Sequence, residues 1–84
     1  MSKAQQVKLN IDLSDKLANY LMSKPDILKK YSGSSYVVFS VNNSALNKLN
    51  LNLIAELQKE GKTVVKAQQS SNLSTPWILT PLHN

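Results

Sequence analysis

The sequence predicts a small α/β domain, bordering on α+β, with a three- or four-stranded sheet and an N-terminal helix packed on it. Three observations predict this fold: a β-branched and aromatic run at 36–41, a long leucine-rich helical repeat, and a second β-rich segment. Such a strand–helix–strand unit, at about 36–69, should have parallel strands and a right-handed crossover. The chain of 84 residues suits a single domain, 1–84.

The N-terminal third divides at Pro25. Apolar and polar residues alternate over 7–13, which favours an extended segment with one buried face. Whether this segment joins the sheet stays open. Ser14 suits a helix N-cap, so we expect the first helix over about 14–23. Pro25 ends that helix and suits the first position of a second, short helix over about 25–30.

The central helix is expected from about 44 to 60. Its leucines recur at spacings of three and four, and Gly61 follows as a left-handed cap. Further apolar residues widen the stripe beyond what one sheet face requires. Either the helix is wedged between the sheet and the first helix, or part of it meets a partner. The stripe consists of Leu46, Leu49, Leu51, Leu53, Ile54, Ala55 and Leu57.

Two further strands are expected after the central helix. Residues 62–68 are rich in β-branched side chains and form the second strand of the unit. Residues 77–80 form a last strand between Pro76 and Pro81. Proline donates no backbone hydrogen bond, so this last strand should lie at an edge of the sheet.

Over about residues 10–67 the chain resembles a family of small prokaryotic α/β proteins known only as a domain of unknown function. The chain departs from that pattern at 32–34, where an Ile-Pro-Asp-type turn is expected, and at 42–44, where acidic residues are expected. The resemblance implies the strand–helix–strand fold and implies no activity. The residues that carry it are Leu13-Ser14, Tyr20-Leu21, Pro25-Asp26, Leu28, Val37-Val38-Phe39, Leu49-Asn50, Leu53, Gly61-Lys62 and Val64-Val65.

Composition excludes several functional classes. The chain has no cysteine, which excludes disulfides, thiol nucleophiles and cysteine-ligated metals. No apolar run approaches the roughly 20 residues of a membrane helix, so we expect no membrane association. The N-terminus lacks the apolar segment of a secretory signal, which predicts a cytoplasmic protein.

Catalytic and cofactor-binding patterns are also missing from the sequence. The single histidine, His83, stands one residue from the C-terminus, where a catalytic base is rarely held in place. The five acidic residues are dispersed, and Gly33 and Gly61, in separate loops, form no phosphate-binding motif. We therefore expect a protein that is not an enzyme, with no catalytic residues, no metal and no cofactor.

Three functional hypotheses remain. The first is a non-catalytic protein-interaction module, homo-oligomeric or partner-bound, because a chain of this size has a thin core and a surplus of apolar helix surface. A tryptophan on an edge strand is also a typical interface anchor. The contact residues expected for this module are Leu51, Ile54, Trp77 and Ile78.

The second hypothesis uses the net charge of +5, which comes entirely from lysine. Nucleic acid would contact Lys24, Lys29, Lys30 and Lys66, with Tyr31 and Tyr36 available for stacking on bases. Arginine, the usual reader of guanine, is absent, so a solvated lysine face is the simpler interpretation.

The third hypothesis is an anion or small-molecule site at the loop after Val41, formed by Asn42, Asn43 and Ser44. These residues would stand where a parallel strand ends and a helix begins, which is a common ligand position in α/β sheets. Capping of the helix alone also explains them.

Overall fold

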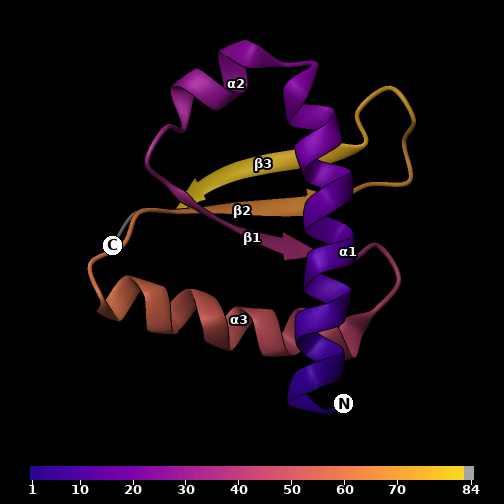
Figure 1. Ribbon diagram of the computed structural model, residues 1–84, viewed down its shortest axis with the longest axis vertical. Coiled ribbons are helices and arrows are strands. Elements are labelled where there is room, and N and C mark those ends of the chain that lie inside the picture. The colour runs from indigo at the N-terminus through magenta and orange to yellow at the C-terminus, as the bar shows by residue number, and fades with distance from the viewer. Residues whose placement is uncertain (83–84) are drawn as a thin grey trace.

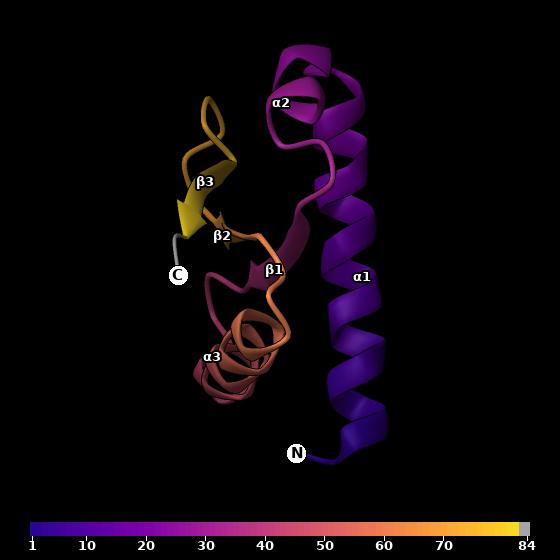
Figure 2. The same cartoon turned by 90° about the vertical axis from the view of Figure 1, so that its left-hand side faces the viewer.

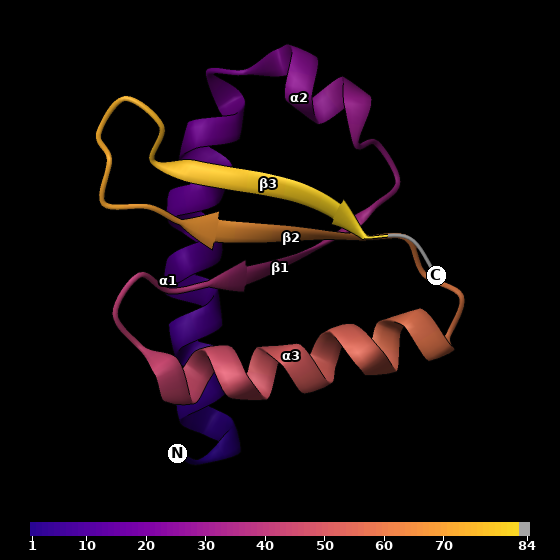
Figure 3. The ribbon, with the colours of Figure 1, turned by 180° about the vertical axis from the view of Figure 1, so that it is seen from behind.

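The computed structural model describes residues 1–82, in which helices pack against a three-stranded mixed sheet (Figure 1). In the sheet order β1-β2-β3, β1 and β2 are parallel and β2 and β3 are antiparallel. The connection from β1 through α3 to β2 is right-handed (Figure 3). This arrangement confirms the predicted fold class. The elements are α1 (Lys3–Met22), α2 (Pro25–Lys30), β1 (Ser35–Phe39), α3 (Ser44–Lys59), β2 (Val64–Gln69) and β3 (Trp77–Leu82).

The extended segment predicted over 7–13 is wrong, because helix α1 already begins at Lys3. Ser2 caps the helix: its hydroxyl accepts from the Gln5 N–H at 3.1 Å, and the Gln5 side chain accepts from the Ser2 N–H at 2.9 Å. This reciprocal pair is a capping box. Ser14 therefore lies inside the helix and does not cap it.

Helical geometry divides the alternating apolar residues between two faces of α1. Residues two apart in a helix point about 200° apart. Leu9 and Leu13 therefore turn towards the sheet, and Val7 and Ile11 turn away from it. The outward pair is 49% and 55% exposed.

The other elements follow the sequence closely. Pro25 opens α2, and Asn43 caps α3 by accepting from the Leu46 N–H at 3.0 Å. Gly61 adopts a φ of 77°, the left-handed conformation expected after the central helix. Strand β3 lies at an edge and continues through Pro81, which stands opposite Val65.

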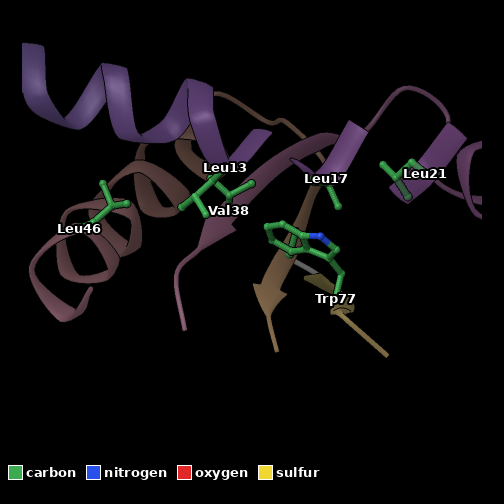
Figure 4. Packing of buried hydrophobic residues seen from close by; sticks show 7 residues of the cluster. Leu13, Leu17, Leu21, Val38, Leu46 and Trp77 are labelled. Carbon is green, nitrogen blue, oxygen red and sulfur yellow. The ribbon is translucent and has the colours of Figure 1, made fainter. Parts of the chain in front are cut away.

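Two apolar clusters lie on opposite faces of the sheet. On the first face α1 crosses the strands (Figure 2), and Leu13, Leu17 and Leu21 pack against strand residues such as Val38 and Trp77 (Figure 4). The second cluster joins α3 to the other face. It contains Val37, Phe39, Ile54 and Val64.

Helix α3 contributes to both clusters, because it lies alongside the free edge of β1 (Figure 3). Leu46 enters the cluster beneath α1, and Ile54 enters the cluster on the opposite face. This position explains why its apolar stripe is wider than one sheet face requires.

A buried amide network fixes α1 against α3. Asn50 is fully buried, and its amide nitrogen donates to the Val38 carbonyl and to Asn10 Oδ1, both at 2.8 Å. Its oxygen accepts from Asn10 Nδ2 at 3.1 Å and from Gln6 Nε2 at 3.2 Å. Both donors and both acceptor positions of Asn50 are thus used. The Val38 carbonyl belongs to the edge strand β1, so the network also covers part of that edge.

Candidate functional site

The sheet face opposite α1 is covered by a helix over only half of its width. Helix α3 packs on the β1 side, and no described helix lies over the β2–β3 side (Figures 2 and 3). The strand register places Lys66 beside Thr80, and Gln68 beside Ile78, on this uncovered half. We call these four residues, Lys66, Gln68, Ile78 and Thr80, the open sheet face.

The open sheet face combines apolar surface with one anchored charge. Ile78 is 53% exposed. The Lys66 ammonium lies 4.8 Å from the centre of the Phe39 ring, in a cation–π contact that holds the charge beside the apolar cluster. Leu51 of α3 is 55% exposed and stands one helical turn from Ile54, which packs against the same face of the sheet.

The four residues expected at a protein interface separate into two pairs. Leu51 and Ile78 are exposed, whereas Ile54 and Trp77 are only 7% and 6% exposed. Ile54 packs between α3 and the sheet, and Trp77 packs between the sheet and α1. Both side chains belong to the chain's own core, so the expectation that they contact a partner is corrected. Neighbouring strand residues point to opposite faces, which explains why Trp77 is buried and Ile78 is not.

The four lysines of the nucleic-acid hypothesis do not share one surface. Lys24, Lys29 and Lys30 lie around α2, which packs on the α1 side of the molecule. Lys30 stands over the Tyr31 ring at 5.4 Å. Lys66 lies on the opposite face of the sheet.

Tyr36, one of the two expected stacking residues, packs against the cluster beneath α1. Its buried hydroxyl has no hydrogen-bond partner among residues 1–82. Burial, and then the neighbouring Tyr31, raise the pKa of the Tyr36 phenol. The hydroxyl end of Tyr36 is therefore enclosed, and the side chain is part of the packing beneath α1.

The loop after β1 uses its own polar atoms. Asn42 Oδ1 accepts from the Ser40 hydroxyl at 2.9 Å, Asn43 caps α3, and Ser44 is the first residue of that helix. Asn47, which the sequence analysis missed, accepts from the Ser40 N–H at 2.7 Å and donates to the Ser40 carbonyl at 2.9 Å.

A pocket of about 280 Å³ lies beside this loop, and α1 contributes both Asp12 and Lys16 to its lining. Asp12 and Lys16 bring one negative and one positive charge to this lining, so it carries no net charge that would attract an anion. The Asn42 and Asn43 side-chain oxygens accept hydrogen bonds within the loop, which fits helix capping, and Lys16 is the one cationic residue of the described pocket lining.

The remaining expectations concern catalysis, metal binding and membrane association. His83 lies outside the described residues. Among residues 1–82, no group of three or more His, Asp or Glu side chains is placed to hold a metal ion. No helix in this range is long and apolar enough to span a membrane.

None of the protein-family models matches the chain, and no curated protein or solved structure matches it either. The resemblance to a family of unknown function therefore stays a prediction.

Proposed function

We propose that the protein is a small, non-catalytic interaction module whose open sheet face binds a protein surface. The observation that carries this proposal is the exposed Ile78 on the half of the sheet that no described helix covers. An exposed apolar side chain on a flat sheet face gains burial when a second protein packs against it. Leu51 extends the apolar surface along α3.

The same face supports a protein partner better than a nucleic acid. Its one cation, Lys66, is held against an aromatic ring, and the remaining lysines of the nucleic-acid hypothesis surround α2 on the other side. Nucleic-acid affinity grows with the number of cations that reach phosphates together. A partner with an apolar centre and a nearby carboxylate would match Ile78 and Lys66.

The partner is more suited to packing on the face than to adding a strand beside β3. Pro81 lies within β3 and lacks the N–H that a new strand would need. The contact is therefore expected to depend on side chains at positions 51 and 78.

A site-specific cross-linking experiment tests the proposal. The chain contains no cysteine, so Ile78→Cys gives a single site for a photoactivatable thiol reagent. Asn72→Cys, in the exposed loop before β3, is the matched control. Circular dichroism confirms that both labelled chains fold. We expect that irradiation in the source cells cross-links the chain labelled at position 78 to one protein. The chain labelled at position 72 should not form this adduct.

The protein found in the adduct is then purified, and we expect it to bind the unlabelled chain. Ile78→Asp should weaken this binding by about tenfold or more, because it places a charge in a buried contact. Adducts that are identical at positions 78 and 72, or an adduct consisting of nucleic acid, contradict the proposal.

A further inference from the structure

The outer face of α1 carries a stripe of apolar and small residues that the fold does not use. The members recur at spacings of three and four, which align them along one side of a helix. Val7 and Ile11 are large and about half exposed, and the others are small or lie near the ends of the helix. We call this surface the outer stripe: Ala4, Val7, Ile11, Ser14, Ala18 and Met22.

The outer stripe has the shape of a helix-packing surface. A shallow depression runs beside Val7 and Ile11, with Ala4 at one end and Lys8 and Asp12 along its flank. Small residues at Ala4, Ser14 and Ala18 would allow a second helix to approach closely. A partner helix could therefore bury the two large side chains.

The charges along the stripe identify the partner as a second copy of the chain. Lys8 and Asp12 stand four residues apart on the same flank of α1. If two copies pack antiparallel about a two-fold axis between residues 10 and 11, Lys8 of each copy lies close to Asp12 of the other, and Ala4 lies close to Ala18. In a parallel pair about a two-fold axis, the Lys8–Asp12 flanks of the two copies would lie on opposite edges of the contact and would not meet. The flank is thus complementary to itself in one orientation only.

The distribution of charge also favours self-association through the outer face of α1. Two chains of charge +5 repel each other over most of their surfaces. Helix α1 carries two of the five acidic residues, Asp12 and Asp15, so its charge is closer to balance than that of the chain as a whole.

We propose that the protein forms a homodimer in which the outer stripes of two α1 helices pack antiparallel. This inference goes beyond the interaction proposed for the open sheet face and does not depend on it, because the two surfaces lie on opposite sides of the molecule (Figure 2).

Sedimentation equilibrium over a wide range of chain concentrations tests dimer formation. We expect a monomer–dimer equilibrium for the unmodified chain and loss of the dimer in Val7→Gln/Ile11→Gln, because glutamine preserves helix propensity and removes the apolar contact. Ile78→Gln is the matched control on the other face and should leave the dimer unchanged. Circular dichroism verifies that each variant remains folded. A monomer at every concentration overturns the inference, and so does loss of the dimer in Ile78→Gln alone.

Charge reversal tests the pairing of Lys8 with Asp12. Lys8→Glu and Asp12→Lys should each weaken self-association by at least about threefold, since each converts two attractive contacts into repulsive ones. An equimolar mixture of the two variants should associate at least as strongly as the unmodified chain. A mixture that associates no better than either variant alone contradicts the pairing.

Disulfide trapping determines the orientation. With no native cysteine, Ala4→Cys and Ala18→Cys each introduce one thiol on the stripe. Antiparallel packing predicts that mild oxidation of a mixture joins position 4 of one chain to position 18 of the other. Disulfides that join only like positions would show a parallel pair and overturn the proposed geometry.

Discussion

The two halves of α1 are attached to the rest of the protein by different forces. In the C-terminal half, Leu13, Leu17 and Leu21 are buried against the sheet. In the N-terminal half, Gln6 and Asn10 reach α3 through amide hydrogen bonds. Apolar burial has no preferred direction, whereas a paired amide has one geometry. The leucines therefore supply most of the attachment energy, and the amides fix where the helix lies.

The magnitudes support this division of roles. Full burial of a leucine side chain contributes about 1.5–3 kcal/mol, and a typical internal hydrogen bond contributes a net 0.5–1.5 kcal/mol, approximately. A broken buried amide costs more than it contributed, because its partners lose solvation and gain nothing. Both halves are thus sensitive to substitution, for different reasons.

The largest effect is expected at Leu17, which is almost completely buried. Leu17→Ala removes apolar contacts and leaves a cavity, so the free energy of unfolding should fall by about 2–5 kcal/mol. Ile11→Ala, in the same helix but exposed, should change it by less than about 0.5 kcal/mol in the monomer. Urea unfolding followed by circular dichroism at low chain concentration measures both values. Equal losses would mean that the two faces of α1 are equally buried.

The next largest effect is expected in the amide network. Asn50→Ala leaves Asn10 and the Val38 carbonyl without their partner and should cost about 1–3 kcal/mol of unfolding free energy. Asn10→Ala should cost less, and the double variant should cost less than the sum by at least about 0.5 kcal/mol, because the residues share bonds. Asn52→Ala, exposed on the same helix, is the control. Additive losses would show that the network is not coupled.

Much of this fold could be predicted because single residues decide it locally. Pro25 starts α2, and Gly61 takes the left-handed conformation that ends α3. The β-branched run at 36–41 similarly predicts β1. These signals require no knowledge of distant contacts.

The first half of α1 could not be assigned in this way. Alternation over 7–13 fits a half-buried strand, and it also fits a helix with apolar residues on two sides. Ser2 and Gln5 carry the local signal for the helix. The contact that stabilises the helix here is distant in sequence, because Asn10 forms its hydrogen bonds with Asn50, forty residues away.

The surface residues were predictable only in part, for a related reason. Strand alternation predicts that Trp77 and Ile78 point to opposite faces, but the position of α1 decides which of them is covered. The same holds for Leu51 and Ile54 on α3, because that helix lies at a sheet edge. The position of Asn50 could have predicted a buried polar contact on α3. This asparagine stands four residues from both Leu46 and Ile54 and interrupts a buried apolar stripe.

A smaller effect, confined to the N-terminal half of α1, is expected at the Ser2 cap. Ser2→Ala removes the acceptor for the Gln5 N–H and should destabilise the helix start by about 1 kcal/mol. Hydrogen exchange should accelerate at the first amides of α1 and remain unchanged near Leu17 and Leu21. Ser14→Ala is the matched control, because it removes an exposed hydroxyl from the helix interior and should be neutral or slightly stabilising. Faster exchange along the whole helix would contradict independent attachment of its halves.

The smallest effect is expected at Tyr36, which packs against the cluster of the C-terminal half. Its buried hydroxyl has no partner among residues 1–82, so Tyr36→Phe should be neutral or stabilise the fold by at most about 1 kcal/mol.

The pH dependence separates this hydroxyl from the paired amides, which do not titrate. Burial, and secondarily Tyr31, raise the pKa of the Tyr36 phenol above its ordinary value near 10, so the folded state favours the neutral form. The stability linked to Tyr36 is therefore complete below about pH 10 and declines as the pH rises through the folded-state pKa. The free energy of urea unfolding should fall more steeply with alkaline pH for the unmodified chain than for Tyr36→Phe. Parallel profiles for the two proteins would mean that the Tyr36 hydroxyl is as well solvated in the folded state as in the unfolded chain.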